Sequence, residues 1–236
     1  MSIELMPRTR SRDLSGFGVF SHGDSGEAHV MAHRMLDEER HELGYHQLGA
    51  WLSQHEGTGS DWTHLQWHMA VFEVAVGDWE VALARFEHEI MPVAIRSDDA
   101  LTDAPAMAWR LWLSAPRAVE LPWEGVRSRA LRHLGKCGCP YVELHCLLAL
   151  AGARDTESLD HWLRITRQRR HEATRLLGEL GFGLRAFAAA DYELAALSLQ
   201  AAVPRVAELG GSRAQNLLFH DIEDYCWREA AVGIAA

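Results

Sequence analysis

Apolar residues recur at helical spacing along nearly the whole chain after residue 26. No proline interrupts residues 27–90, where three breaks separate four helices of about four turns each. Further along, Pro140 begins a helix that extends to Gly152, and a long helix over residues 173–189 precedes the last two. The pattern predicts an all-α protein with about ten or eleven helices.

The first 26 residues differ from the rest of the chain. They are polar and rich in Gly and Ser, and they end near Asp24 and Ser25, either of which suits a helix N-cap. We therefore expect residues 1–26 to form a flexible or capping arm. Residues 27–236 are expected to form a single helical-repeat domain, because no linker divides them.

One short motif occurs twice. The sequence GDWEVAL at residues 77–83 recurs as ADYELAA at residues 190–196, and RHELG at residues 40–44 resembles a degenerate third copy. A small residue that turns the chain, an aromatic wedge and closely packing alanines are typical of helical hairpin repeats. The chain is therefore predicted to be a tetratricopeptide-like α-solenoid of stacked helical hairpins.

Five further motifs resemble, in order, those of the tetratricopeptide-repeat protein 38 family. They are AHVMAH at 28–33, HLQWHMA at 64–70, DA and WRL within 103–111, ELH at 143–145 and GGSRAQ at 210–215. The resemblance covers about residues 27–225 and implies an architecture more than a chemistry. Two features depart from the family pattern. Arg213 stands where the family has histidine, and the family extends further at its N-terminus, so we expect a shortened, bacterial relative.

Composition and charge narrow the classes of function. Ala and Leu supply over a quarter of the chain, which favours helix, and the net charge of −10 gives no general attraction to nucleic acid or anionic lipid. No apolar run approaches the roughly 20 residues of a membrane span. Four cysteines are too few for a disulfide scaffold, and a single lysine among 23 basic residues is typical of GC-rich bacterial genes. We expect a cytoplasmic bacterial protein that binds neither nucleic acid nor membranes.

Two pairs of histidines are the main candidates for chemistry. His29 and His33 are four residues apart, as are His64 and His68, so each pair shares one face of its predicted helix. Such imidazoles can transfer protons near a carboxylate such as Asp61, chelate a metal, or hydrogen-bond between packed helices. These three roles stay open, and the spacing favours the structural and acid–base roles. We therefore assign no metal ligand and no cofactor, and we predict that both pairs face one space.

Other residues are candidates for the remainder of such a site. His145 and Glu143 share a third predicted helix, and Asp61 or Glu143 is expected to orient an imidazole. Trp67 is the best candidate for an aromatic wall, although tryptophan more often packs in a core. Arg110 can hold an anionic group in bidentate fashion.

Two further hypotheses concern Arg213 and a group of cysteines. Arg213 and Gln215 are candidate anchors for an anion, and we predict that Arg213 borders the histidine site; the alternative is a surface salt bridge. A second group has the donors of a zinc site at unusual spacing, so free thiols in a loop are favoured there. Its members are His133, Cys137, Cys139 and His145.

The favoured function is a histidine-lined concave pocket that binds a small molecule, in a bacterial biosynthetic pathway. If the protein is an enzyme, histidine acid–base chemistry would use His64, His68, His33 and Asp61. Binding roles are expected for His29, Trp67, Arg110, His145, Glu143, Arg213 and Gln215. The alternative is a non-catalytic adapter that holds a peptide or partner protein in the groove. We also expect a homodimer, because the apolar face of the first helix lacks a predicted neighbour.

Overall fold

The computed structural model describes residues 25–116, 118–136, 138–166 and 172–234, and these residues form helices and their connections with no strand. This confirms the predicted all-α class. The elements are α1 (Ser25–Asp37), α2 (His41–Leu52), α3 (Gly59–Ala75), α4 (Trp79–Arg85), a π-helical turn (Phe86–Ile90), α5 (Met91–Arg96), α6 (Asp103–Ser114), α7 (Trp123–His133), α8 (Pro140–Gly152), α9 (Thr156–Thr166), α10 (Glu172–Ala188), α11 (Tyr192–Ala202), a 3₁₀ segment (Val203–Leu209) and α12 (Arg213–Ile234). None of the described helices is long and apolar enough to cross a membrane.

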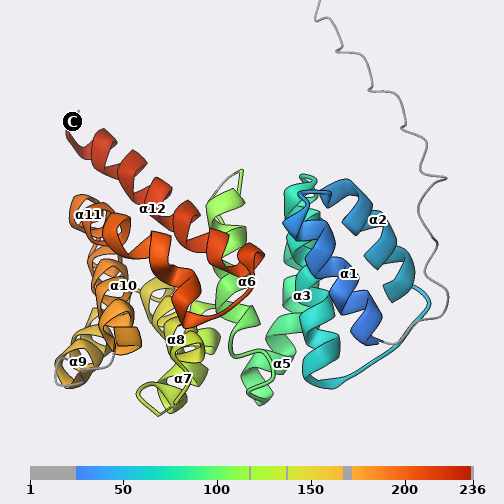
Figure 1. The fold of residues 1–236 in the computed structure, drawn as a ribbon, viewed down its shortest axis with the longest axis horizontal. Helices are drawn as coiled ribbons and strands as arrows, with labels where there is room; N and C mark the ends of the chain where they lie inside the picture. Colours follow the sequence, from blue (N-terminus) through green and yellow to red (C-terminus); the bar gives the residue numbers. More distant parts are fainter. Residues whose placement is uncertain (1–24, 117, 137, 167–171, 235–236) are drawn as a thin grey trace, which may run out of the picture.

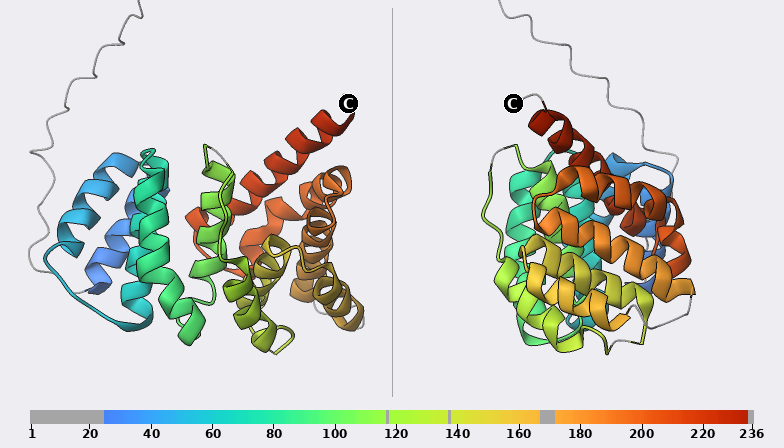
Figure 2. Two further views of the ribbon diagram at one scale, coloured as in Figure 1. Left: turned by 180° about the vertical axis from the view of Figure 1, so that it is seen from behind. Right: turned by 90° about the vertical axis from the view of Figure 1, so that its left-hand side faces the viewer.

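Helix α6 joins two groups of helices (Figure 1). Helices α1 to α3 lie at one end of the molecule and α9 to α11 at the other, and α6 packs against both α3 and α8. Helix α12 packs on α11 and α6, and its first turns reach α1. The view from behind shows α12 running across the molecule from the C-terminus towards its centre (Figure 2). The first and last described helices therefore meet beside α6.

The same type of turn joins the two helices of four hairpins. These hairpins are α1 with α2, α3 with α4, α8 with α9 and α10 with α11. In each, a residue in the left-handed region donates its N–H to the carbonyl three residues back, and the next residue donates to the carbonyl five residues back. These are the two bonds of a Schellman motif. The left-handed residues are Glu39, Gly77, Arg154 and Ala190, with φ of 56°, 88°, 58° and 59°.

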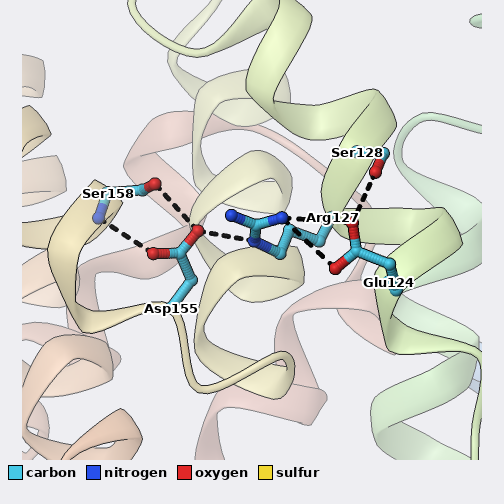
Figure 3. A network of polar contacts seen from close by, with 5 residues as sticks. All are labelled: Glu124, Arg127, Ser128, Asp155 and Ser158. Carbon is cyan, nitrogen blue, oxygen red and sulfur yellow. Dashed lines mark hydrogen bonds and ion pairs between the residues drawn. The ribbon is translucent and has the colours of Figure 1, made fainter.

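The third of these turns has no counterpart among the predicted copies. Its sequence, RDTE at residues 154–157, lacks both the small residue and the aromatic wedge of the copies at residues 77–83 and 190–196. Asp155 accepts hydrogen bonds from the backbone N–H of Ser158 at 3.0 Å and from its hydroxyl at 2.8 Å (Figure 3). Arg127 donates to Asp155 at 2.6 Å and also pairs with Glu124. This network caps α9 and ties the hairpin to α7.

Tryptophans fix the position of α6 between its neighbours. Trp79, at the start of α4, donates its indole N–H to the carbonyl of Leu111 at 3.0 Å. Trp109 donates to the carbonyl of Leu148, in α8, at 2.9 Å and is fully buried. Because buried indole N–H groups need an acceptor, these hydrogen bonds fix the position of α6 along α4 and α8.

The reason given for a homodimer is wrong for most of the face concerned. Of the four large apolar residues on α1, Met31, Met35 and Leu36 are buried, and Val30 alone is exposed, at 68%. Helix α1 packs against α2, α3 and α12, so it does have neighbours. The dimer itself stays a prediction. Helix α1 begins at Ser25, so the last two residues of the expected arm over residues 1–26 are helical, and residues 1–24 lie outside the described residues.

Candidate metal centre

The two histidine pairs meet between α1 and α3. The ring centroids of His29 and His64 lie 4.9 Å apart, and those of His33 and His68 lie 4.5 Å apart. Each of the four side chains offers one ligand atom, and these four atoms lie within 4.8 Å of one another. The structure therefore confirms that both pairs face one space.

Small residues allow the two helices to bring these rings together. Ala28 and Ala32, each directly before a histidine of α1, are fully buried, and so is Ala70 on α3. Behind α3, Gly44 of α2 lies so close to the ring of Phe72 that a Cβ there would be only 2.2 Å from a ring carbon. The absence of side-chain bulk at Gly44 sets the spacing between α2 and α3, the helix that carries His64 and His68.

Asp103, the first residue of α6, orients one of the four imidazoles. Both of its carboxylate oxygens lie 3.0 Å from Nδ1 of His64, and the side chain is 3% exposed. Nδ1–H of His64 donates to the carboxylate, so its Nε2 is the atom with a free lone pair. Asp103 belongs to the DA motif at residues 103–104, but the sequence predicts that Asp61 or Glu143, rather than Asp103, orients an imidazole.

Burial keeps most of the cluster neutral. It lowers the pKa of His29 and His33, and it lowers the pKa of His68 well below its usual value, with the neighbouring histidines adding to the effect. Burial also lowers the pKa of His64, but the hydrogen bond and charge of Asp103 outweigh it, so the net shift is upward. Neutral imidazoles are the form that binds metal.

His68 is the most deeply buried member of the cluster. Its side chain is fully buried, and neither ring nitrogen has a hydrogen-bond partner among the described residues. Nε2 of His33 lies 2.9 Å from Nε2 of His29, so one of these two rings donates to the other. Buried polar atoms without a partner are rare in native proteins. Binding of a cation at His68 would supply the missing interaction for one of its nitrogens.

The spacing suits a transition-metal ion. With metal–nitrogen bonds of about 2.0–2.1 Å, neighbouring ligand nitrogens lie roughly 3.3 Å apart in a tetrahedron and roughly 2.9 Å apart in an octahedron. The ligand atoms here range from the 2.9 Å contact of His29 with His33 to the 4.8 Å limit of the group. Small rotations of the side chains would therefore bring all four within bonding distance of one ion.

Trp67 and Asp61 flank the cluster in different ways. The indole of Trp67 is stacked on the ring of His64, with centroids 5.4 Å apart and planes 5° apart, and it also contacts His68. The guanidinium carbon of Arg110 is 5.3 Å from the centroid of Trp67. Asp61 is exposed, and its charge raises the pKa of His29 and His64 without a hydrogen bond to either.

Glu143 and His145 do not join the cluster. Glu143 accepts hydrogen bonds from the indole of Trp162 and from the backbone N–H of Gly135 at 2.6 Å, so it holds α8 against its neighbours. The prediction that it orients an imidazole is wrong. His145 donates from Nδ1 to the carbonyl of Tyr141 at 2.8 Å, and burial lowers its pKa to about 4.

Arg213 and Gln215 take structural roles at the start of α12. Arg213 donates to the carbonyl of Asp37 and to the carboxylate of Glu39, both at 2.7 Å, in an exposed ion pair at the end of α1. This is the surface salt bridge given as the alternative, and it contains none of the four histidines. Gln215 accepts from the backbone N–H of Ser212 at 2.8 Å and so caps the helix locally.

The cysteine-containing group does not form a site in the described part of the chain. His133 pairs with Asp98 at 2.9 Å, Cys139 is an exposed free thiol, and Cys137 lies outside the described residues. Among the residues that the structure describes, the four histidines are the one group with metal-ligand spacing.

No protein-family model matches this chain, and no solved structure matches it significantly.

Proposed function

We propose that this protein binds one divalent transition-metal ion through His29, His33, His64 and His68, and that the ion is the reactive centre of a small-molecule site. The observation that carries the proposal is the convergence of four imidazole ligand atoms, from two helices, within 4.8 Å. Imidazole is the ligand that zinc, copper, iron and nickel share.

Metal binding fits the electrostatics better than acid–base chemistry does. A general base working near neutral pH needs a pKa close to that pH, whereas burial lowers the pKa of three of the four histidines, including His68. The contact between His64 and Asp103 is typical of metal sites, where the second nitrogen of a ligating histidine donates to a carboxylate. A purely structural role would leave both nitrogens of His68 without a partner among the described residues.

Partial exposure supports a reactive role for the ion. His68 is buried, but the side chain of His64 is 23% exposed, and His29 and His33 are also partly exposed. Solvent therefore reaches the cluster from one side. An ion that keeps a position open on that side would polarise a bound carbonyl or lower the pKa of a bound water.

We also propose that the helical hairpins stack as a tetratricopeptide-type solenoid. The four Schellman turns, and the aromatic residues that follow two of them, support stacking of the hairpins as a tetratricopeptide-type solenoid. We propose in addition that the chain belongs to the family that its sequence motifs resemble. A bacterial origin and a cytoplasmic location are part of this proposal.

Metal analysis of the purified full chain tests the proposal. We expect about one equivalent of a transition metal per chain, and its loss in His68→Ala. His29→Ala is a second variant, because His29 is partly exposed and its removal disturbs the core less. His161→Ala, which removes an exposed histidine of α9, is the control and should retain the metal. If folded His29→Ala and His68→Ala hold as much metal as the control, the proposed ligand set is wrong.

Cobalt substitution tests the reactive role separately. Co²⁺ absorption reports the number of ligands, and azide shifts the bands where a coordination position is open to solvent. We expect azide to perturb the spectrum of the Co²⁺ protein. Unchanged bands would mean a closed, structural site and would refute the reactive half of the proposal.

A further inference from the structure

A groove of about 370 Å³ is lined by residues of α1, α2, α3, α6 and α12. Apolar side chains from four helices line much of it, among them Leu36, Val71, Leu113 and Leu217. Leu217 is 43% exposed, so the groove opens to solvent. Its volume is at the lower end of the range for small-molecule sites, roughly 300–1,000 Å³.

Arg110 lines this groove and has no carboxylate of the described residues within ion-pair distance, although the charges of Asp221 and Asp103 act on it from further away. Its side chain is 8% exposed, and it donates to the carbonyls of Ala106, at 3.2 Å, and of Ala214. These contacts use two of its five N–H donors, and no carboxylate of the described residues forms an ion pair with it. Burial lowers the pKa of Arg110 to about 10, so the group is still charged at neutral pH. A buried cation without a directly paired anion is costly, and an anionic ligand in contact with it would relieve that cost.

Two acidic residues of α12 restrict the charge of the ligand. Asp221 and Asp224 also line the groove, both are exposed, and neither has an ion-pair partner among the described residues. Partial desolvation of its carboxyl group raises the pKa of Asp221; the charge of Arg110 acts to lower this pKa, and the charge of Asp224 adds to the rise. These carboxylates repel a dianion such as phosphate more strongly than a monoanion, whose single charge can be compensated by Arg110; Arg228 also lines the groove and offsets part of the charge of the two carboxylates.

We propose that the groove binds a small monocarboxylate with an apolar body, whose carboxylate pairs with Arg110 and whose body lies against Val71 and Leu113. The proposal does not depend on a metal in the histidine cluster. The two sites are nevertheless neighbours, because Trp67 contacts both Arg110 and His68.

Calorimetric titration of the full chain with 4-methylpentanoate tests this proposal. The neutral isostere 4-methylpentanamide and the dianion isobutylmalonate are the matched probes. We expect saturable binding of 4-methylpentanoate, and affinities at least about tenfold lower for the amide and the dianion. No saturable binding of the monocarboxylate, or equal binding of the amide, would overturn the proposal.

Two variants locate the binding. Arg110→Gln should weaken binding of 4-methylpentanoate at least about tenfold. Because Arg110 also tethers α6 to Ala214, this variant can lose stability, so a second variant fills the groove from its exposed rim. Ala75→Trp should abolish binding, whereas Leu197→Trp, at an exposed site on α11, should bind normally. Unaltered binding of 4-methylpentanoate in folded Ala75→Trp would refute the proposed location. Metal content is measured on the same samples, so failure of this proposal can be distinguished from failure of the proposed metal centre.

Discussion

Replacement of Asp103 by asparagine isolates the contribution of one carboxylate to the proposed metal centre. Both oxygens of Asp103 lie 3.0 Å from Nδ1 of His64, and the side chain is 3% exposed. Asparagine has the same shape, and its amide oxygen can still accept the Nδ1–H hydrogen bond. Asp103→Asn therefore keeps the orientation of His64 and removes the negative charge behind it.

The expected magnitude follows from the role of such partners. Loss of a carboxylate behind a ligating histidine lowers metal affinity about 10- to 100-fold, or about 1.4–2.7 kcal/mol. The same substitution should lower the pKa of His64, because the hydrogen bond and charge of Asp103 are what raise it against the effect of burial.

Competition between the metal-free protein and a colour-changing zinc chelator measures the affinity, and an NMR titration of His64 measures its pKa. Asp61→Asn is the matched control, since Asp61 acts on His64 through charge alone. We expect this control to change zinc affinity less than about threefold. Wild-type affinity in Asp103→Asn, or equal losses in both variants, would refute the argument that the hydrogen-bonded carboxylate tunes a metal ligand.

Three further predictions concern stability and assembly. Gly44→Ala should lower the free energy of unfolding by about 1–3 kcal/mol, because the new methyl group collides with Phe72. Gly178→Ala meets no atom and should raise the free energy of unfolding by about 0.5–1 kcal/mol. Urea denaturation that finds Gly44→Ala the more stable of the two variants would contradict this. Stability of the metal-free protein should fall as the pH drops below about 6.5, by up to about 1.4 kcal/mol per pH unit for His68, because unfolding lets this neutral histidine bind a proton. His64, with a raised pKa, opposes that trend, and a slope unchanged in His68→Gln would exclude His68 as its source. Light scattering tests the predicted homodimer, which a monomer mass of 26.5 kDa would refute.

Local patterns along the chain were sufficient for the helical class and for part of the site. Helical periodicity predicts α3 and α10, and the copies at residues 77–83 and 190–196 mark two of the four shared turns. The turn at Arg154 was missed because a left-handed arginine carries no glycine-like signal in the sequence. The spacing of four residues places His29 with His33, and His64 with His68, because one turn of an α-helix brings such positions onto one face.

Only the tertiary structure decided which groups meet across helices. Asp103, rather than Asp61 or Glu143, orients His64 because the packing of α6 against α3 joins residues 39 positions apart. The same packing buries Arg110 beside α12, while Arg213 is drawn to the end of α1 instead. Periodicity determines the face of a helix on which a side chain lies. Which other helix that face packs against depends on how the side chains of separate helices fit together, and no short stretch of the chain encodes this fit.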